Sequence, residues 1–142
     1  MSGLGSYVKR WRAAVHVTAV ALMVAVPGLA VTPVAGAAAA AASLSVSHAW
    51  QTGFIAHFVV VNSSTVPMTD WKLEFDLPAG ESVWHTWNST FTQYGTHYVL
   101  TPANWNRTLA PGASATGGFR GILSGPYIPP QNCVLNGQYL CR

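Results

Sequence analysis

The stretch WKLEFDL (residues 71–77) decides the fold class, because its residues alternate strictly between apolar and charged. The apolar set is Trp71, Leu73, Phe75 and Leu77, and the charged set is Lys72, Glu74 and Asp76. A period of two residues predicts a β-strand with one buried face and one face in water. Trp71 is therefore predicted to lie in the core.

Further strands are predicted on both sides of this one. They are GFIAHFVVVN (53–62), which is apolar on both faces, THYVLTP (96–102) and ATGGFRGIL (115–123). Turn signals such as NSSTVP and LPAGE separate the strands, and no segment after residue 37 shows a convincing helical period. This pattern predicts an all-β fold, an antiparallel β-sandwich of the immunoglobulin-like or jelly-roll-like kind.

The first 37 residues predict a secretory signal peptide. Lys9, Arg10 and Arg12 precede an uncharged, largely apolar run (13–26), and Ala-Gly-Ala at 35–37 offers a cleavage site. A membrane-spanning helix needs roughly 20 apolar residues, so the shorter run makes an uncleaved anchor the weaker alternative. KRWR (9–12) lacks a twin-arginine pair. We therefore expect cleavage after Ala37, secretion by the general route, and no membrane association afterwards.

The segment that follows is expected to be a short Ala-rich flexible lead (38–43), and the domain itself is expected to span 44–142. After residue 37 the chain has four basic and four acidic residues. The basic residues are Lys72, Arg107, Arg120 and Arg142, and the acidic residues are Asp70, Glu74, Asp76 and Glu81. The predicted net charge is therefore zero. No basic patch is available to neutralise phosphates, which argues against nucleic-acid binding.

The C-terminal stretch CVLNGQYLC (133–141) predicts a hairpin around the turn signal Asn136-Gly137. A three-residue loop would pair Leu135 with Tyr139 and bring Cys133 opposite Cys141. Export permits such a pair to form a disulfide. Two cysteines alone are too few ligands for a structural metal site, so no metal is expected.

Three tryptophans occur in stretches whose other residues mark turns and solvent. They are Trp50 in SHAWQTGF (47–54), Trp87 in WHTWNST (84–90) and Trp105 in PANWNRT (102–108). Tryptophan is usually largely buried, so three exposed indoles on one small domain exceed what an inert surface carries. We expect them to bind a ligand, whereas Trp84 is more typical of a packing or edge contact.

These motifs resemble the family 2 carbohydrate-binding modules of bacterial secreted glycanases. The resemblance runs from Trp50 to about Gly121 through WQTGF (50–54), HTWNST (85–90), TQYG (92–95), ANWN (103–106) and LAPGASATGGF (109–119). It implies a β-sandwich that binds polysaccharide, needs no cofactor and does no chemistry. It also implies that Trp50, Trp87 and Trp105 form the flat binding strip. Unlike this family, the chain has no cysteine in AASLSVSHA (41–49).

The resemblance further implies the ligand type. Gly53 stands where cellulose- and chitin-binding members have glycine and xylan-binding members tend to have arginine. Trp105 is the strip residue that xylan-type members tend to lack. We therefore expect a monomer that binds insoluble cellulose or chitin, with a xylan or other glycan binder, or a secreted adhesion protein, as alternatives.

An indole laid flat on the apolar C–H face of a pyranose buries apolar area, and neighbouring polar groups can bond the hydroxyl rim. The predicted rim residues are Gln51, His48, His85, Asn104 and Asn106. Glycoside hydrolysis normally needs two facing carboxylates. Three of the four acids lie on or beside the strand at 71–77, as ordinary solvated positions. The sequence therefore predicts a binding protein and not an enzyme.

Overall fold

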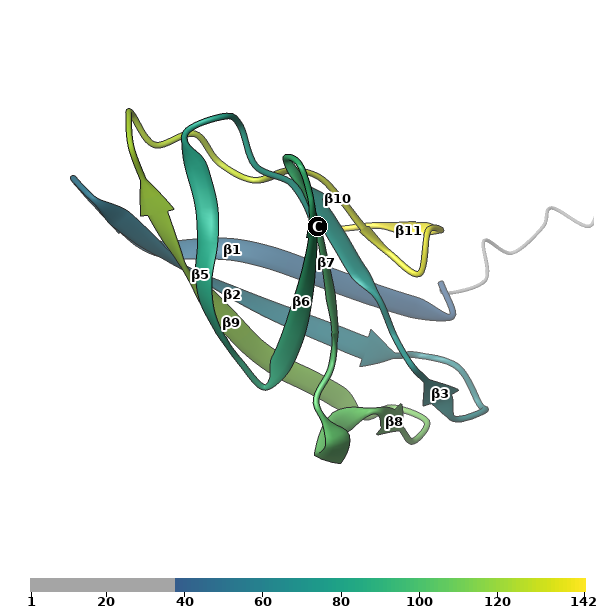
Figure 1. The fold of residues 1–142 in the computed structure, drawn as a ribbon. Helices are drawn as coiled ribbons and strands as arrows, with labels where there is room; N and C mark the ends of the chain where they lie inside the picture. The colour runs from purple at the N-terminus through teal and green to yellow at the C-terminus, as the bar shows by residue number, and fades with distance from the viewer. Residues whose placement is uncertain (1–37) are drawn as a thin grey trace, which may run out of the picture. The chain divides into compact units, whose positions relative to one another are not determined.

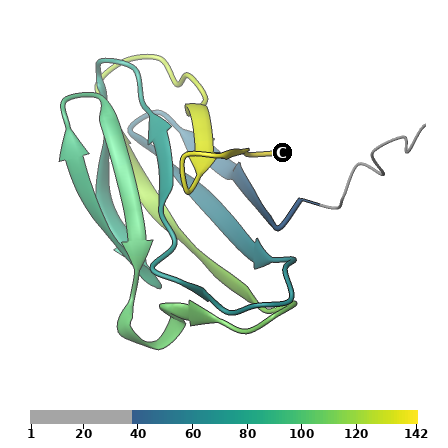
Figure 2. The ribbon, with the colours of Figure 1, turned by 90° about the vertical axis from the view of Figure 1, so that its right-hand side faces the viewer.

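The computed structural model describes residues 38–142, which form an antiparallel β-sandwich (Figures 1 and 2). One sheet has the order β1 (Ala40–Trp50), β2 (Gly53–Asn62), β9 (Ser114–Leu123) and β5 (Glu81–Trp87). The other has the order β11 (Tyr139–Leu140), β10 (Gln131–Leu135), β4 (Leu73–Asp76), β7 (His97–Pro102) and β6 (Ser89–Tyr94). A short ribbon of β3 (Met68–Thr69) and β8 (Thr108–Leu109) and a 3-10 turn, η1 (Asn104–Asn106), complete the fold. The predicted fold class is confirmed.

Aromatic side chains fill the space between the two sheets. The fully buried ones are Trp71, Tyr98, Phe54, Phe58, Phe75 and Phe119. The Phe75 ring is stacked between Phe119, at 5.1 Å between centroids, and Tyr98, at 5.7 Å. Because Phe75 comes from β4 and Phe119 from β9, this stack joins the two sheets. Trp71 is in the core, as its place in the alternating stretch predicts.

The predicted strands at 53–62, 96–102 and 115–123 correspond closely to β2, β7 and β9. The stretch at 71–77 is extended only over β4 (Leu73–Asp76), although its apolar side chains are all buried as predicted. The expected lead at 38–43 is different in the structure. From Ala40 onward it belongs to β1, and Ala40 and Ala42 lie in the core, so the expectation of a flexible segment is corrected there. The expected signal peptide lies outside the described residues.

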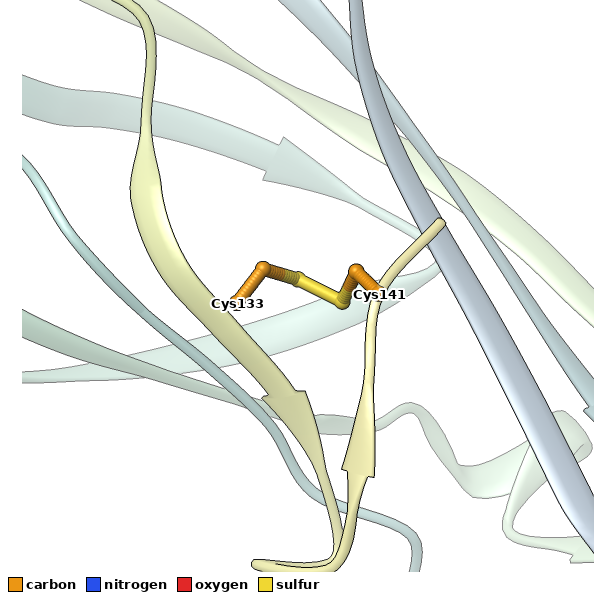
Figure 3. Close-up of a disulfide and its surroundings, with 2 residues drawn as sticks. All are labelled: Cys133 and Cys141. Atoms are coloured by element: carbon orange, nitrogen blue, oxygen red, sulfur yellow. A yellow bond between two sulfur atoms is a disulfide. The ribbon is translucent and has the colours of Figure 1, made fainter.

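The C-terminal hairpin has the predicted register. Val134 pairs with Leu140 and Leu135 with Tyr139, and Asn136 and Gly137 both take positive φ in the turn. Cys133 and Cys141 form the predicted disulfide (Figure 3). The last residue then meets the first sheet, because the Arg142 backbone N–H donates to the carbonyl of Ala42 at 3.0 Å. Figure 2 shows this yellow hairpin beside the blue strand β1.

Candidate functional site

The outer face of the β1-β2-β9-β5 sheet carries its side chains in rows that run across the strands. The first row holds Trp50, Gly53 and Ile122; the second holds His48, Ile55, Arg120 and His85; the third holds His57, Gly118 and Trp87. Successive rows are two residues apart along a strand, which is about 6.6 Å. We call these three rows the tryptophan face. It has a tryptophan in its first and third rows and Arg120 in the row between them.

Trp50 lies on the backbone of Gly53. A Cβ atom at residue 53 would lie 2.8 Å from Cζ2 of the Trp50 ring and 2.7 Å from the carbonyl oxygen of Gly121. The indole N–H of Trp50 donates to the Thr52 hydroxyl at 3.1 Å, which fixes the ring within its own hairpin. The ring is therefore half-buried, with the backbone of Gly53 against it.

Trp87 is placed in the same way one strand further on. It pairs with Gly118, and a Cβ atom at residue 118 would overlap the indole ring. His57 meets the Trp87 ring edge-on, with 5.7 Å between centroids, and its Nε2 lies 3.0 Å from the Ser47 hydroxyl. Gly118 was not among the predicted site residues. The signal was available, since a Gly-Gly pair inside a strand marks a close approach of another group.

β-Bulges adjust the direction of the side chains on both edge strands of this sheet. The pairing register shifts between Val46 and His48 in β1, and between Val83 and His85 in β5. A bulge inserts an extra residue and re-aims the side chains around it. In β5 it leaves the neighbours Trp84 and His85 both exposed, which simple alternation would not allow.

Trp105 is held at the end of this face by a chain of hydrogen bonds. Trp71 donates its indole N–H to the carbonyl of Asn106 at 2.9 Å, which anchors η1 to the core. The Asn106 amide donates to the carbonyl of Asn88 at 2.7 Å, and the Asn88 amide donates to the carbonyl of Thr116 at 2.9 Å. The Trp105 side chain itself is 75% exposed.

A hollow of about 770 Å³ joins Trp87 to Trp105. The turn residue Asn88 and the strand residues Thr90 and Thr101 also line it, with the two threonine hydroxyls 2.7 Å apart. A smaller hollow of about 450 Å³ lies at the opposite end, between Trp50 and Tyr127. Each end of the tryptophan face therefore opens into a recess that has both aromatic and polar walls.

The predicted rim residues are distributed along this path. His48 lies 5.8 Å from the Trp50 ring, Gln51 is exposed beside it, and His85 is exposed in the middle row. Asn104 is exposed in η1 and lines the larger hollow. Asn106 is partly buried, because its amide nitrogen is used by Asn88, and its carboxamide oxygen has no hydrogen-bond partner among the described residues.

Arg120 was not among the residues predicted for the face, and Trp84 was predicted to make a packing or edge contact. The guanidinium carbon of Arg120 lies 5.4 Å from the centroid of Trp50 and 5.0 Å from that of Trp84. Trp84 is 60% exposed. Both contacts fall within the range of cation–π interactions. The bulge in β5, which the sequence does not reveal, is what turns Trp84 toward Arg120.

No carboxylate side chain of the described residues belongs to the three rows of the tryptophan face. On the outer face of the second sheet, His97 Nδ1 is 2.7 Å from Asp76 Oδ1, and His97 Nε2 is 3.5 Å from Glu74 Oε1. Hydrogen bonds from Asn132 and from His97 lower the pKa of Asp76, and the bond to Asp76 is the largest cause that raises the pKa of His97. Burial raises the pKa of Glu81, whose Oε1 accepts from the backbone N–H of Ile128.

Asp70 is 3.5 Å from Arg107, at the edge of the larger hollow. Between residues 38 and 142 no group of three histidine, cysteine or carboxylate side chains could hold a metal ion. No helix in that part of the chain is long and apolar enough to cross a membrane.

Comparisons with known proteins place this arrangement in a family. The model of the family described as cellulose binding domain matches residues 40–141. The chain is 69% identical to the cellulose/chitin binding protein of Mycobacterium tuberculosis strain H37Rv, over 99% of both chains. It is 42% identical to chitinase C of Streptomyces lividans, over 78% of this chain and 17% of that enzyme.

A solved structure agrees with these matches. The chitin-binding domain of Chi18aC from Streptomyces coelicolor superimposes with a TM-score of 0.61 and 38% identity, over 72% of this chain and 96% of that domain. Both the sequence match and the fold extend over the strands that carry the tryptophan face. The chain therefore belongs to the family 2 carbohydrate-binding modules.

Proposed function

We propose that this protein docks onto insoluble cellulose or chitin through a strip formed by Trp50, Trp87 and Trp105. The observation that carries the proposal is the pair of glycines, Gly53 and Gly118, on which two of the indoles lie. A glycine in a strand costs stability, and here it makes room for a ring laid against the sheet. Rings held in this way have a fixed orientation, in which a sugar ring can lie against them.

The energetics favour a ligand that meets all three rings. If each ring buries roughly 100 Å² on a sugar face, it contributes about 2.5 kcal/mol at about 25 cal/mol per Å². Three rings then contribute roughly 7–8 kcal/mol, against an association cost of roughly 4–15 kcal/mol. One ring would not offset that cost. An extended, ordered polysaccharide surface can contact all three rings at once.

The relatives support the same ligand class. The Mycobacterium tuberculosis relative is named a cellulose/chitin binding protein, and the related Streptomyces coelicolor domain is named chitin-binding. His48, Gln51, His85 and Asn104 are exposed beside the strip and are proposed to bond the hydroxyl rim. Asn106 is proposed to act mainly by holding the Trp105 turn, since its amide nitrogen bonds Asn88.

The proposed role is binding without catalysis. Glu74 and Asp76 are bound to His97 on the opposite sheet, and Glu81 is buried against Ile128. None of these carboxylates belongs to the tryptophan face, where a bound glycan would lie. We further propose that the protein is exported, with its first 37 residues removed as a signal peptide.

A retention assay on insoluble polysaccharides tests this function. Purified residues 38–142 should be retained on microcrystalline cellulose or chitin more strongly than on insoluble xylan, and soluble oligosaccharides of the same type should compete. A protein-adhesion role predicts retention that ignores the sugars. Release of reducing sugar during the incubation would contradict a purely binding function.

A further inference from the structure

Arg120 occupies the middle of the tryptophan face. It pairs with Ile55 on one side and His85 on the other, in the row between those of Trp50 and Trp87. Its own neighbours along β9, Ile122 and Gly118, belong to the first and third rows. A polysaccharide chain that contacts both Trp50 and Trp87 must therefore cross the row of Arg120.

Two indoles hold the guanidinium group of Arg120 in this place. The distances of 5.4 Å to the Trp50 centroid and 5.0 Å to the Trp84 centroid put it between rings from the two edge strands. Arginine stacks on aromatic faces and is more weakly hydrated than lysine. The two indoles can therefore restrict the Arg120 guanidinium group at a small cost in solvation free energy. The residue remains exposed, with N–H donors available to a ligand.

The charge on this face has one sign. No aspartate or glutamate of the described chain belongs to its three rows, and Arg120 is the one lysine or arginine in them. The carboxylates of the described chain that form ion pairs do so with other residues: Glu74 and Asp76 with His97, and Asp70 with Arg107. Arg120 thus lacks a carboxylate partner within residues 38–142, and a ligand would meet its full charge.

We propose that Arg120 is a specificity-determining residue that makes the strip reject cationic, deacetylated glucosamine polymers while accepting their neutral acetylated form. This rests on the proposed function. An acetamido group presents a carbonyl oxygen, which accepts a hydrogen bond from guanidinium. Removal of the acetyl group leaves an ammonium, which the guanidinium repels and cannot bond. Like charges brought together across an interface suppress the wrong partner.

Binding isotherms on chitin particles and on the same particles after chemical deacetylation test the proposal. At about pH 5.5, where glucosamine amines carry a proton, the wild type should bind the deacetylated particles more weakly than the acetylated ones. Exposed charge pairs contribute up to about 1 kcal/mol, so we expect a difference of about fivefold. Arg120→Gln should reduce this difference in affinity between the two kinds of particle to less than about twofold. Arg120→Lys, which keeps the charge, should retain most of it.

The matched control is Arg142→Gln, which removes the same charge near Val59 and Val61, away from the three rows. It should leave unchanged the ratio of the affinity for acetylated particles to the affinity for deacetylated particles. Added salt should also reduce the ratio for the wild type, because exposed charges are screened. Equal binding to both particles by the wild type, or an unchanged ratio in a folded Arg120→Gln, would overturn the role of Arg120. Failure to bind chitin and cellulose at all would instead overturn the proposed function.

Discussion

The hydrogen atom that serves as the side chain of Gly118 leaves the space in which the Trp87 ring lies. A methyl group there would overlap the indole ring and the carbonyl oxygen of Ala56. Gly117 and Gly121 leave similar spaces on the inner side, for the rings of Phe58 and Phe54. Glycine at these positions of β9 therefore allows aromatic rings to pack closely on both faces of one strand.

Gly118→Ala is accordingly expected to weaken binding to cellulose or chitin by about fivefold or more, because Trp87 must leave its position. Overpacking should also lower the free energy of unfolding by about 1–3 kcal/mol. Adsorption isotherms and urea unfolding measure the two effects. Gly125→Ala is the control for the unfolding measurement only, since a methyl group there meets nothing within 4 Å but the residue lines the hollow beside Trp50. Full affinity in Gly118→Ala would show that the position of Trp87 does not matter.

Trp71 and Trp105 differ in role although both lie outside the strands of the sandwich. Trp71 is fully buried and bonds Asn106, whereas Trp105 is exposed. Trp71→Ala should lower the free energy of unfolding by about 3–5 kcal/mol, because it leaves a cavity. Trp105→Ala should change it by less than about 0.5 kcal/mol. Urea unfolding followed by circular dichroism would detect the difference; equal losses would mean that Trp105 is part of the core.

At the scale of the strand, residues 71–77 and β2 were predictable because periodicity and apolar runs are local properties. β1 was not, because its first half is a run of alanine and serine whose composition resembles a linker. β1 forms a strand because it pairs with β2 along its whole length, from Ala40 opposite Asn62 to Trp50 opposite Gly53. The bulge at Trp84 and the contact of Arg120 with two indoles also depend on neighbours distant in sequence.

The opposite sheet has its own exposed cluster, where His97 of β7 meets Asp76 and Glu74 of β4. The native pKa of Asp76 is lowered from 3.8, so its contribution to stability is present above that pH and is lost on further acidification. The native pKa of His97 is raised from 6.5, so its contribution is present below that pH and is lost as the pH rises through the native value. Together they stabilise the fold most between these two values.

His97→Gln should therefore lower the melting temperature most between about pH 4 and 6.5. The difference from wild type should shrink at higher pH, as His97 loses its proton in the native protein. The effect should be small, because both side chains are more than a third exposed to water. Thermal unfolding of the two proteins over a pH series measures it. A difference that grows above neutral pH would contradict the assigned pair.

For the molecule as a whole, the two sheets have separate roles. Their inner faces supply the aromatic core, the outer face of β1-β2-β9-β5 carries the indoles and Arg120, and the acidic cluster lies on the second sheet. The three tryptophans proposed to form the strip could be selected from the sequence because indoles between turn residues are unusual. Among their supports, Gly118 has a sequence signal in the Gly-Gly pair of its strand, whereas Thr52 and the bond from Trp71 to Asn106 act through contacts made only in the fold.

The measurement that tests this account most directly is a set of adsorption isotherms on microcrystalline cellulose and chitin. Trp50→Ala, Trp87→Ala and Trp105→Ala should each lose about 1–3 kcal/mol of binding free energy and stay folded. Tyr94→Ala is the control, because Tyr94 is 66% exposed on β6 of the other sheet. It should bind like the wild type. Tryptophan variants that adsorb as strongly as the wild type, or a Tyr94 variant that loses as much, would contradict the account.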